Sequence, residues 1–199
     1  MANLGYMQVV RGCNQYCRFC SNPSTGYQLD LETARREVDD FAARGYCGVI
    51  LTGGEPSLSE IVPEVTRYAV SRGLHVRTIT NGSRLSTPGL AEEYVAAGLV
   101  HFHVSLHTAR EELQDFLTGV KGSWAMATRA IANLGAAGAV VDVNTVINRF
   151  NADHLDETVR FLLARFPFNG DPEGLTVPEE QLSHQVSMNP EPRKFPNTC

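Results

Sequence analysis

Short apolar runs alternate with amphipathic stretches along the chain, an arrangement typical of repeated βα units in a parallel sheet. The apolar runs are nearly continuous in valine, isoleucine and leucine, as expected for strands covered on both faces. They predict strands at 5–10, 47–52, 75–80, 100–106 and 139–147. The amphipathic stretches predict helices at 31–44, 58–72, 88–97, 123–137 and 153–166. The pattern therefore predicts an α/β fold with five βα units.

Capping residues support these helix starts. Asp30, Ser123 and Asp153 stand at the beginnings of periodic stretches and are expected to be N-caps. Thr108 with Glu111 three residues later forms a capping box, which predicts a short extra helix.

The last part of the chain breaks the pattern. Residues 167–199 hold six of the ten prolines and have no strong periodicity. A sixth strand is expected after the fifth helix, and only 175–177 or 185–188 could supply it. We expect a core domain over 1–166. The proline-rich tail over 167–199 is expected to complete or cover the sheet, to lead into a further domain, or to be partly disordered.

Length, charge and apolar content argue against several classes of protein. The chain has 199 residues, which is short for a complete (β/α)8 barrel of about 250. A net charge of −5 argues against a nucleic-acid surface. No apolar run approaches the roughly 18 residues of a membrane span, and the first residues lack the pattern of a signal peptide. A cytoplasmic protein that binds neither membrane nor nucleic acid is expected.

Cysteine usage is the most informative feature of the composition. Three of the five cysteines, Cys13, Cys17 and Cys20, fall within eight residues, whereas Cys47 and Cys199 are isolated. An odd count without an export signal argues against a disulfide framework. Three thiolates on one loop leave one position of a four-ligand site unfilled. The three cysteines by themselves fit two kinds of site. One is a zinc site whose fourth ligand is a distant histidine or Cys47, and the other is an iron–sulfur cluster with one open iron. Otherwise Cys47 is expected to be a buried, inert thiol.

The cysteine spacing is more specific than the count. C-x3-C-x2-C, with Phe19 just before the third cysteine, resembles the signature of the radical S-adenosylmethionine (radical SAM) superfamily. Gly53-Gly54-Glu55-Pro56 ends the second predicted strand and resembles the GGEP motif of the same superfamily. Two glycines let a backbone come close to a ligand, and backbone and carboxylate oxygens can accept hydrogen bonds from an ammonium group.

Three later segments extend the resemblance to residues 5 to about 166. Thr80-Asn81-Gly82 resembles the turn that ends the third strand of the family. Val104-Ser105-Leu106 resembles a fourth-strand motif whose serine lies near the SAM ribose and carboxylate. The segment around Asn144 resembles the fifth strand, where this asparagine would contact the ribose or the methionine end of SAM.

The resemblance implies a partial (β/α)6 TIM-type barrel with parallel strands and the cysteine loop after the first strand. Cys13, Cys17 and Cys20 would hold a [4Fe–4S] cluster, and SAM would chelate its fourth iron. An electron from a flavodoxin- or ferredoxin-type donor would cleave SAM and give a 5′-deoxyadenosyl radical that abstracts hydrogen from the substrate. The cofactor-binding candidates are Phe19, Gly53, Gly54, Glu55, Asn81, Ser105 and Asn144.

The substrate class stays open within this interpretation. A peptide or protein is favoured over a polar small molecule, because a partial barrel with a short tail leaves its side open to large partners. The alternative to an enzyme is a non-catalytic zinc- or iron–sulfur-binding module, or a degenerate relative that uses the fold for interaction.

A row of histidines follows the fourth predicted strand. Side chains alternate between the two faces of a strand, so one face carries His101, His103, Ser105 and His107. Asp142 and Asn144 share a face of the fifth strand. These polar faces are expected to line the barrel interior, which is otherwise mostly branched aliphatic.

Several roles are open to these residues. His103 and His107 are the candidate catalytic residues, facing SAM or the substrate, whereas His101 is expected to be structural. A metal bound by the three histidines, or core histidines satisfied by hydrogen bonds, are the alternatives. Arg77 would meet a substrate anion or pair with a neighbouring acid.

Overall fold

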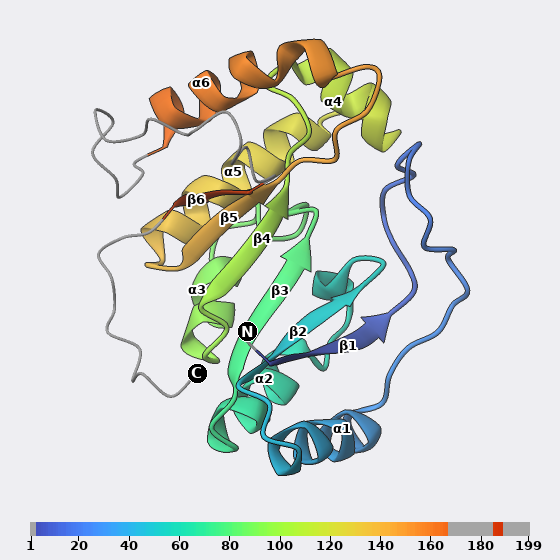
Figure 1. The fold of residues 1–199 in the computed structure, drawn as a ribbon, viewed down its shortest axis with the longest axis vertical. Coiled ribbons are helices and arrows are strands. Elements are labelled where there is room, and N and C mark those ends of the chain that lie inside the picture. Colours follow the sequence, from blue (N-terminus) through green and yellow to red (C-terminus); the bar gives the residue numbers. More distant parts are fainter. Residues whose placement is uncertain (1–2, 167–184, 189–199) are drawn as a thin grey trace.

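A curved six-stranded sheet forms the centre of the computed structural model, which describes residues 3–166 and 185–188. The strand order is β1-β2-β3-β4-β5-β6 (Figure 1). The strands are β1 (Leu4–Val10), β2 (Gly48–Gly53), β3 (His75–Thr80), β4 (His101–Ser105), β5 (Val140–Asn144) and β6 (Gln185–Met188). The first five pair in parallel in sequence order, which confirms the predicted α/β arrangement.

The helices connect successive strands. They are α1 (Leu31–Ala43), α2 (Val62–Ser71), α3 (Leu90–Ala96), α4 (Glu111–Thr118), α5 (Ser123–Ala136) and α6 (Leu155–Arg165), with short 3-10 turns η1 (Pro56–Leu58) and η2 (Ala152–His154). The predicted extra helix is confirmed as α4, but the capping box of Thr108 and Glu111 is wrong, because the N-cap is Arg110 and has no side-chain cap. Within the described ranges, no helix is both long enough and apolar enough to cross a membrane.

The two faces of the sheet differ in polarity. Helix α1 packs on β1 and β2, α2 on β2 and β3, and α5 on β4 and β5. Apolar side chains of the strands are almost fully buried against these helices, among them Val76, Phe102, Val104, Val141 and Val143. On β4 and β5 most of the intervening positions carry polar side chains on the opposite face, which is the inner face of the partial barrel.

The sixth strand is one of the two predicted candidates, and its direction differs from the expected one. Segment 185–188 pairs with β5, but in the antiparallel sense, with Gln185 opposite Asn144. Parallel pairing requires a crossover that returns the chain to the opposite end of the sheet, whereas a short edge strand can pair in either direction. The other candidate, 175–177, lies outside the described residues. So does the rest of the predicted tail over 167–199, whose role stays a prediction.

Helix capping is only partly as predicted. Asp30 is confirmed as the N-cap of α1, since its carboxylate accepts a hydrogen bond from the Thr33 amide at 2.9 Å. Asp153 is not an N-cap of α6, which begins after His154 and has no side-chain cap. A 3-10 turn that contains Asp153 precedes α6 and displaces the helix start.

The start of α5 is capped from another helix. Ser123 is the first helical residue rather than the N-cap, which is Gly122 with a φ of 82°. Asp115 of α4 supplies the cap instead: its carboxylate accepts hydrogen bonds from the Ser123 hydroxyl at 2.9 Å and the Trp124 amide at 3.1 Å. This carboxylate therefore ties α4 to α5.

Removing this cap should destabilise the fold. We expect Asp115→Ala to lower the free energy of unfolding by about 1–2 kcal/mol, as loss of an N-cap does. Glu112→Ala, on an exposed position of the same helix, should change it by less than about 0.5 kcal/mol. Urea unfolding of both variants measures the difference, and equal values would contradict the capping role.

Candidate functional site

The three clustered cysteines lie on the loop that follows β1. Cys13 and Cys17 are half-buried, Cys20 is exposed, and all three are free thiols. Burial raises the pKa of Cys13. Burial, together with the neighbouring Cys13 and Cys20, raises the pKa of Cys17 to about 11. Three thiolates gathered here would repel one another, so the loop suits a group that binds several sulfurs at once.

Helix α4 holds this loop in place. The amide of Tyr16 donates to the Thr118 carbonyl at 2.8 Å, and the amide of Arg18 donates to the Leu117 carbonyl at 2.9 Å. The Arg18 side chain also donates to the Phe116 carbonyl at 2.9 Å. Carbonyls in the last turn of a helix have no partner within the helix. The cysteine loop therefore satisfies the end of α4, and the helix in turn fixes the path of the loop.

Cys47 lies at the other end of the sheet. Its amide donates to the Asn3 carbonyl beside the start of β1, whereas the cysteine loop follows the end of that strand. Cys47 is half-buried and disulfide-bonded, so the expectation of a buried inert thiol is wrong. The sequence gives no local sign of a partner for an isolated cysteine. This position also rules out Cys47 as the fourth ligand of a zinc site on the loop.

The glycine pair after β2 lies directly against the cysteine loop. The Gly54 amide donates to the Val10 carbonyl at 2.7 Å, and the Glu55 amide donates to the Gly12 carbonyl at 3.0 Å. A Cβ atom on Gly54 would lie 2.1 Å from the Gly12 carbonyl oxygen, and one on Gly53 would lie 1.9 Å from that of Val10. The glycines are therefore required for the approach of two protein segments.

Glu55 joins the ends of two strands. Its side chain is fully buried. The carboxylate accepts hydrogen bonds from the Ser57 amide and hydroxyl, from the Thr80 hydroxyl at 2.7 Å and from the Asn81 amide at 2.6 Å. Burial raises the pKa of Glu55, and the bonds from Ser57, Asn81 and Thr80 oppose that rise. The carboxylate thus fixes the turn after β3 relative to the turn after β2.

The remaining cofactor-binding candidates lie at the same edge of the sheet. The Asn81 side chain donates to Asn14 Oδ1 at 2.9 Å and lies 3.8 Å from Cys13 Sγ. Ser105 pairs with Asn144 across β4 and β5, and both are half-buried. Among the described residues neither of these two side chains has a hydrogen-bond partner, which leaves their polar atoms available to a ligand.

His107 packs behind the cysteine loop. Its ring lies edge-on to Phe19, with centroids 4.7 Å apart. Nδ1 accepts a hydrogen bond from the Val146 amide at 3.2 Å, which places the proton of the neutral ring on Nε2. Burial lowers the pKa of His107 to about 4. The side chain is therefore neutral at neutral pH.

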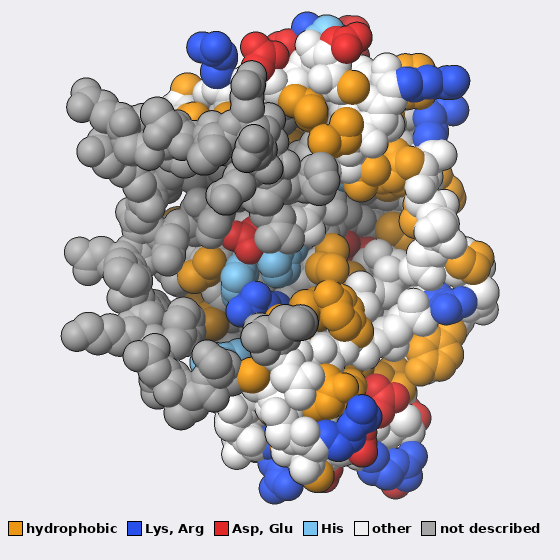
Figure 2. Space-filling view, viewed as in Figure 1, with side chains coloured by type: hydrophobic (Ala, Val, Ile, Leu, Met, Phe, Trp, Pro, Cys, Tyr) orange, Lys and Arg blue, Asp and Glu red, His pale blue; other side chains and the backbone are white. Residues whose placement is uncertain are grey.

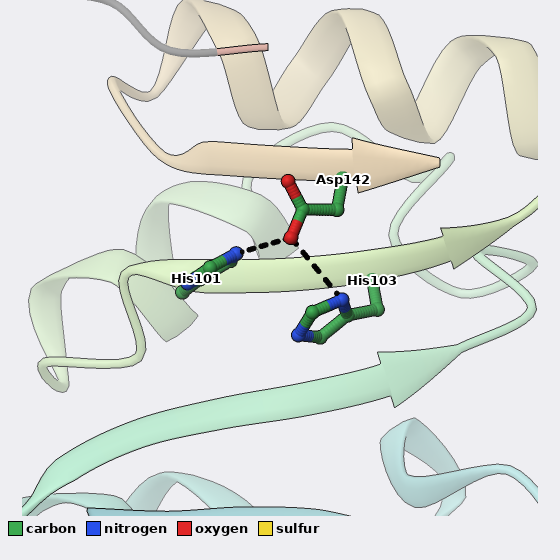
Figure 3. A group of neighbouring side chains, drawn as sticks. All are labelled: His101, His103 and Asp142. Carbon is green, nitrogen blue, oxygen red and sulfur yellow. Dashed lines mark hydrogen bonds and ion pairs between the residues drawn. The ribbon is translucent and has the colours of Figure 1, made fainter. Parts of the chain in front are cut away.

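The other two histidines of the predicted row, His101 and His103, form a separate group with Asp142 (Figure 3). His101 Nε2 lies 2.7 Å and His103 Nδ1 lies 3.3 Å from the same oxygen, Asp142 Oδ2. The two rings stack with centroids 4.8 Å apart. Burial lowers the pKa of His103, while Asp142 raises it and Arg77 lowers it further. In Figure 2, histidines gather in a hollow beside acidic and basic side chains.

A pocket that the sequence did not reveal opens beside the cysteine loop. Its volume is about 530 Å³, and it is lined by Arg18, Phe19, Phe116, Leu117, Asn148, Arg149 and Phe150. The guanidinium of Arg18 lies 4.2 Å from the Phe116 ring centre, and that of Arg149 lies 4.6 Å from the Phe150 ring centre. No periodicity or motif joins these residues, because they come from three separate segments.

The fold and the site together define an α/β protein with a parallel sheet. The carboxyl edge of this sheet carries a loop of three free cysteines, which contacts the turn of the buried Glu55. The family model of the radical SAM superfamily matches residues 7–162. The chain belongs to this superfamily, and the predicted family is confirmed.

Relatives of known name support this assignment. The chain is 33% identical over 160 residues to a PqqA peptide cyclase of Ruegeria pomeroyi, covering 78% of this chain and 42% of that protein. It is 32% identical to an AdoMet-dependent heme synthase of Methanosarcina barkeri (76% and 44%) and 32% identical to the mycofactocin maturase MftC of Mycolicibacterium smegmatis (75% and 39%). The chain thus spans about two fifths of the length of these relatives.

Solved structures confirm the fold. Streptococcus suis SuiB aligns with a TM-score of 0.71 at 17% identity, over 82% of this chain and 37% of that one. Native anSMEcpe with bound AdoMet aligns with a TM-score of 0.66 at 16% identity, over 81% of this chain and 49% of that one. The predicted partial barrel is therefore confirmed.

The contact between the glycine pair and the cysteine loop can be tested by substitution. We expect Gly54→Ala to destabilise the fold by about 1–3 kcal/mol, because the new methyl group overlaps a backbone oxygen. The matched control is Gly135→Ala in α5, where a Cβ would meet nothing within 4 Å. It should be neutral or slightly stabilising. Thermal unfolding compares the two, and a neutral Gly54→Ala would contradict the close contact.

Burial of His107 predicts a dependence of stability on pH. Its folded pKa of about 4 lies below the ordinary value of about 6.5. The unfolded chain therefore binds more protons between these values, and stability falls as the pH drops through this window. From pH 7 to 5 this histidine should cost roughly 2 kcal/mol.

Urea unfolding at both pH values measures this cost. We expect His107→Gln to show a smaller loss of stability between pH 7 and 5 than the unsubstituted chain. His154→Gln, at a surface position, should show the full loss. Equal pH dependence in all three would contradict a buried neutral ring.

Proposed function

We propose that this chain is the SAM-cleaving core of a radical SAM enzyme that modifies a peptide. The observation that carries the proposal is the loop of three free cysteines, Cys13, Cys17 and Cys20, fixed between the Gly53-Gly54 turn and the end of α4. These three sulfurs would hold a [4Fe–4S] cluster with one iron open to SAM. When bound, the cluster and SAM supply reductive cleavage to methionine and a 5′-deoxyadenosyl radical that abstracts hydrogen from the substrate.

The surroundings of the loop suit SAM. Ser105 and Asn144 offer polar side chains without hydrogen-bond partners among the described residues, at neighbouring strand ends. Phe19 offers an aromatic ring within the cysteine motif itself. Gly53 and Gly54 serve in this proposal by letting the turn after β2 pack directly against the cysteine loop.

Two buried groups act by positioning in this proposal. Glu55 has its carboxylate engaged by protein donors, so it orients Asn81 and the turn after β2. His107 supports the Phe19 ring from behind. His103, on the inner face of the barrel, is the candidate catalytic residue that would face the substrate.

Relatives indicate the substrate class. Two relatives bear names that describe peptide cyclisation or maturation, and SuiB has been solved bound to the precursor peptide SuiA. A peptide is therefore favoured over a polar small molecule. The electron donor would be of the flavodoxin or ferredoxin type, in the cytoplasm. The unpartnered side chains of Ser105 and Asn144 at the edge of the cysteine loop favour this enzyme over a non-catalytic metal-binding module.

The proposal is tested by anaerobic reconstitution of the full chain with iron and sulfide, followed by dithionite and SAM. We expect 5′-deoxyadenosine and methionine to form, because the loop supplies three of the four cluster ligands. A Cys13/Cys17/Cys20→Ala variant should lose both the bound iron and the 5′-deoxyadenosine.

The control is Cys47→Ala, which removes the disulfide-bonded cysteine at the far end of the sheet and leaves the three loop cysteines in place. It should keep its iron and its SAM cleavage. A colourless chain with stoichiometric zinc and no SAM cleavage would overturn the proposal in favour of a zinc module.

A further inference from the structure

His101, His103 and Asp142 lie apart from the cysteine loop, on the inner face of the barrel. Two of them are on β4 and the third is opposite on β5, where His103 pairs with Asp142. The side chains are 19%, 9% and 8% exposed, respectively. They form a compact group, of which the proposed function uses only His103, as a residue that would face the substrate (Figure 3).

The group has the composition and spacing of a metal site. Each residue offers one ligand atom, and these atoms all lie within 4.8 Å of one another. In tetrahedral zinc sites, with metal–ligand distances near 2.1 Å, the ligand atoms lie about 3.4 Å apart. Here the two histidine nitrogens lie 2.7 and 3.3 Å from Asp142 Oδ2. Only small movements would bring the three atoms around one ion.

Hydrogen bonding alone does not account for the group. His101 Nε2 is hydrogen-bonded to Asp142, but His103 Nδ1 is buried and has no hydrogen-bond partner despite lying 3.3 Å from that oxygen. A buried polar atom without a partner costs free energy. A metal ion between the three side chains would satisfy this nitrogen, because the ion would bind the lone pair of Nδ1 directly and no N–H donor would have to point at Asp142.

We propose that His101, His103 and Asp142 bind a divalent transition-metal ion of the Zn²⁺ class inside the barrel. Two imidazoles and one carboxylate are a donor set that such ions prefer. Three protein ligands leave a fourth position for water, as in metal sites that also bind a ligand. This site is independent of the cysteine loop and of SAM cleavage.

The positive charge of Arg77 provides a test of whether the group binds a cation. It lies on β3, paired with His101 in the sheet register, and its charge acts on His103. Within the described ranges it forms neither an ion pair nor a hydrogen bond with an acid. A positive side chain beside the group opposes a bound cation. Removing the charge of Arg77 should therefore strengthen metal binding, whereas removing a ligand should weaken it.

The experiment measures Zn²⁺ affinity by chelator competition. It uses the tag-free full chain carrying Cys13/Cys17/Cys20→Ala, in buffer without phosphate or carboxylate. We expect one equivalent of Zn²⁺ per chain. His103→Ala and Asp142→Asn should each weaken binding by at least about tenfold, Arg77→Gln should tighten it, and His154→Ala should leave it unchanged.

Two further measurements guard against misfolding and thiol binding. Circular dichroism of each variant reports whether the fold persists, and Asp142→Asn keeps the shape of the side chain if His103→Ala does not fold. Co²⁺ in place of Zn²⁺ should give d–d bands without a thiolate charge-transfer band. Absence of stoichiometric Zn²⁺, equal affinity of folded Asp142→Asn and His154→Ala, or weaker binding by Arg77→Gln would each overturn the proposal.

Discussion

The close contact of the cysteine loop with the Gly53-Gly54 turn is the constraint on which the rest of the site depends. The Gly12 carbonyl lies where a side chain on Gly54 would lie, and the Glu55 amide is bonded to the same carbonyl. The side chain of the same Glu55 accepts a hydrogen bond from the Asn81 amide, so it connects this contact to the end of β3. The ends of three strands thus have one arrangement relative to the cysteines.

Helix α4 fixes the loop from its other side. Its last carbonyls accept the amides of Tyr16 and Arg18, and its Asp115 caps α5. The helix therefore links the cysteine loop to the packing of α5 on β4 and β5. The cysteine loop needs such external support, because it has little regular structure of its own between Gly12 and Cys20.

Local signals in the sequence were sufficient for the strands, most helices and the cysteine motif. Features set by distant residues were not. The cap of α5 comes from Asp115, eight residues before the serine that local rules favoured, and the direction of β6 depends on a long connection. Alternation predicts His107 in one row with His101 and His103, but β4 ends at Ser105. Alternation stops with the strand, so His107 turns towards Phe19 instead.

The inner face of the barrel therefore has two polar zones along β4. Ser105, beside Asn144, belongs to the edge where the cysteine loop lies, and His103, beside Asp142, lies two residues deeper. Two residues along a strand span about 7 Å, which is within the length of one amino-acid side chain. A substrate that reaches the SAM end of this face could therefore also contact the histidine–aspartate group. A half-buried and a buried histidine around one buried carboxylate are costly to maintain where branched aliphatic residues could stand. This cost is understandable if the group binds a ligand.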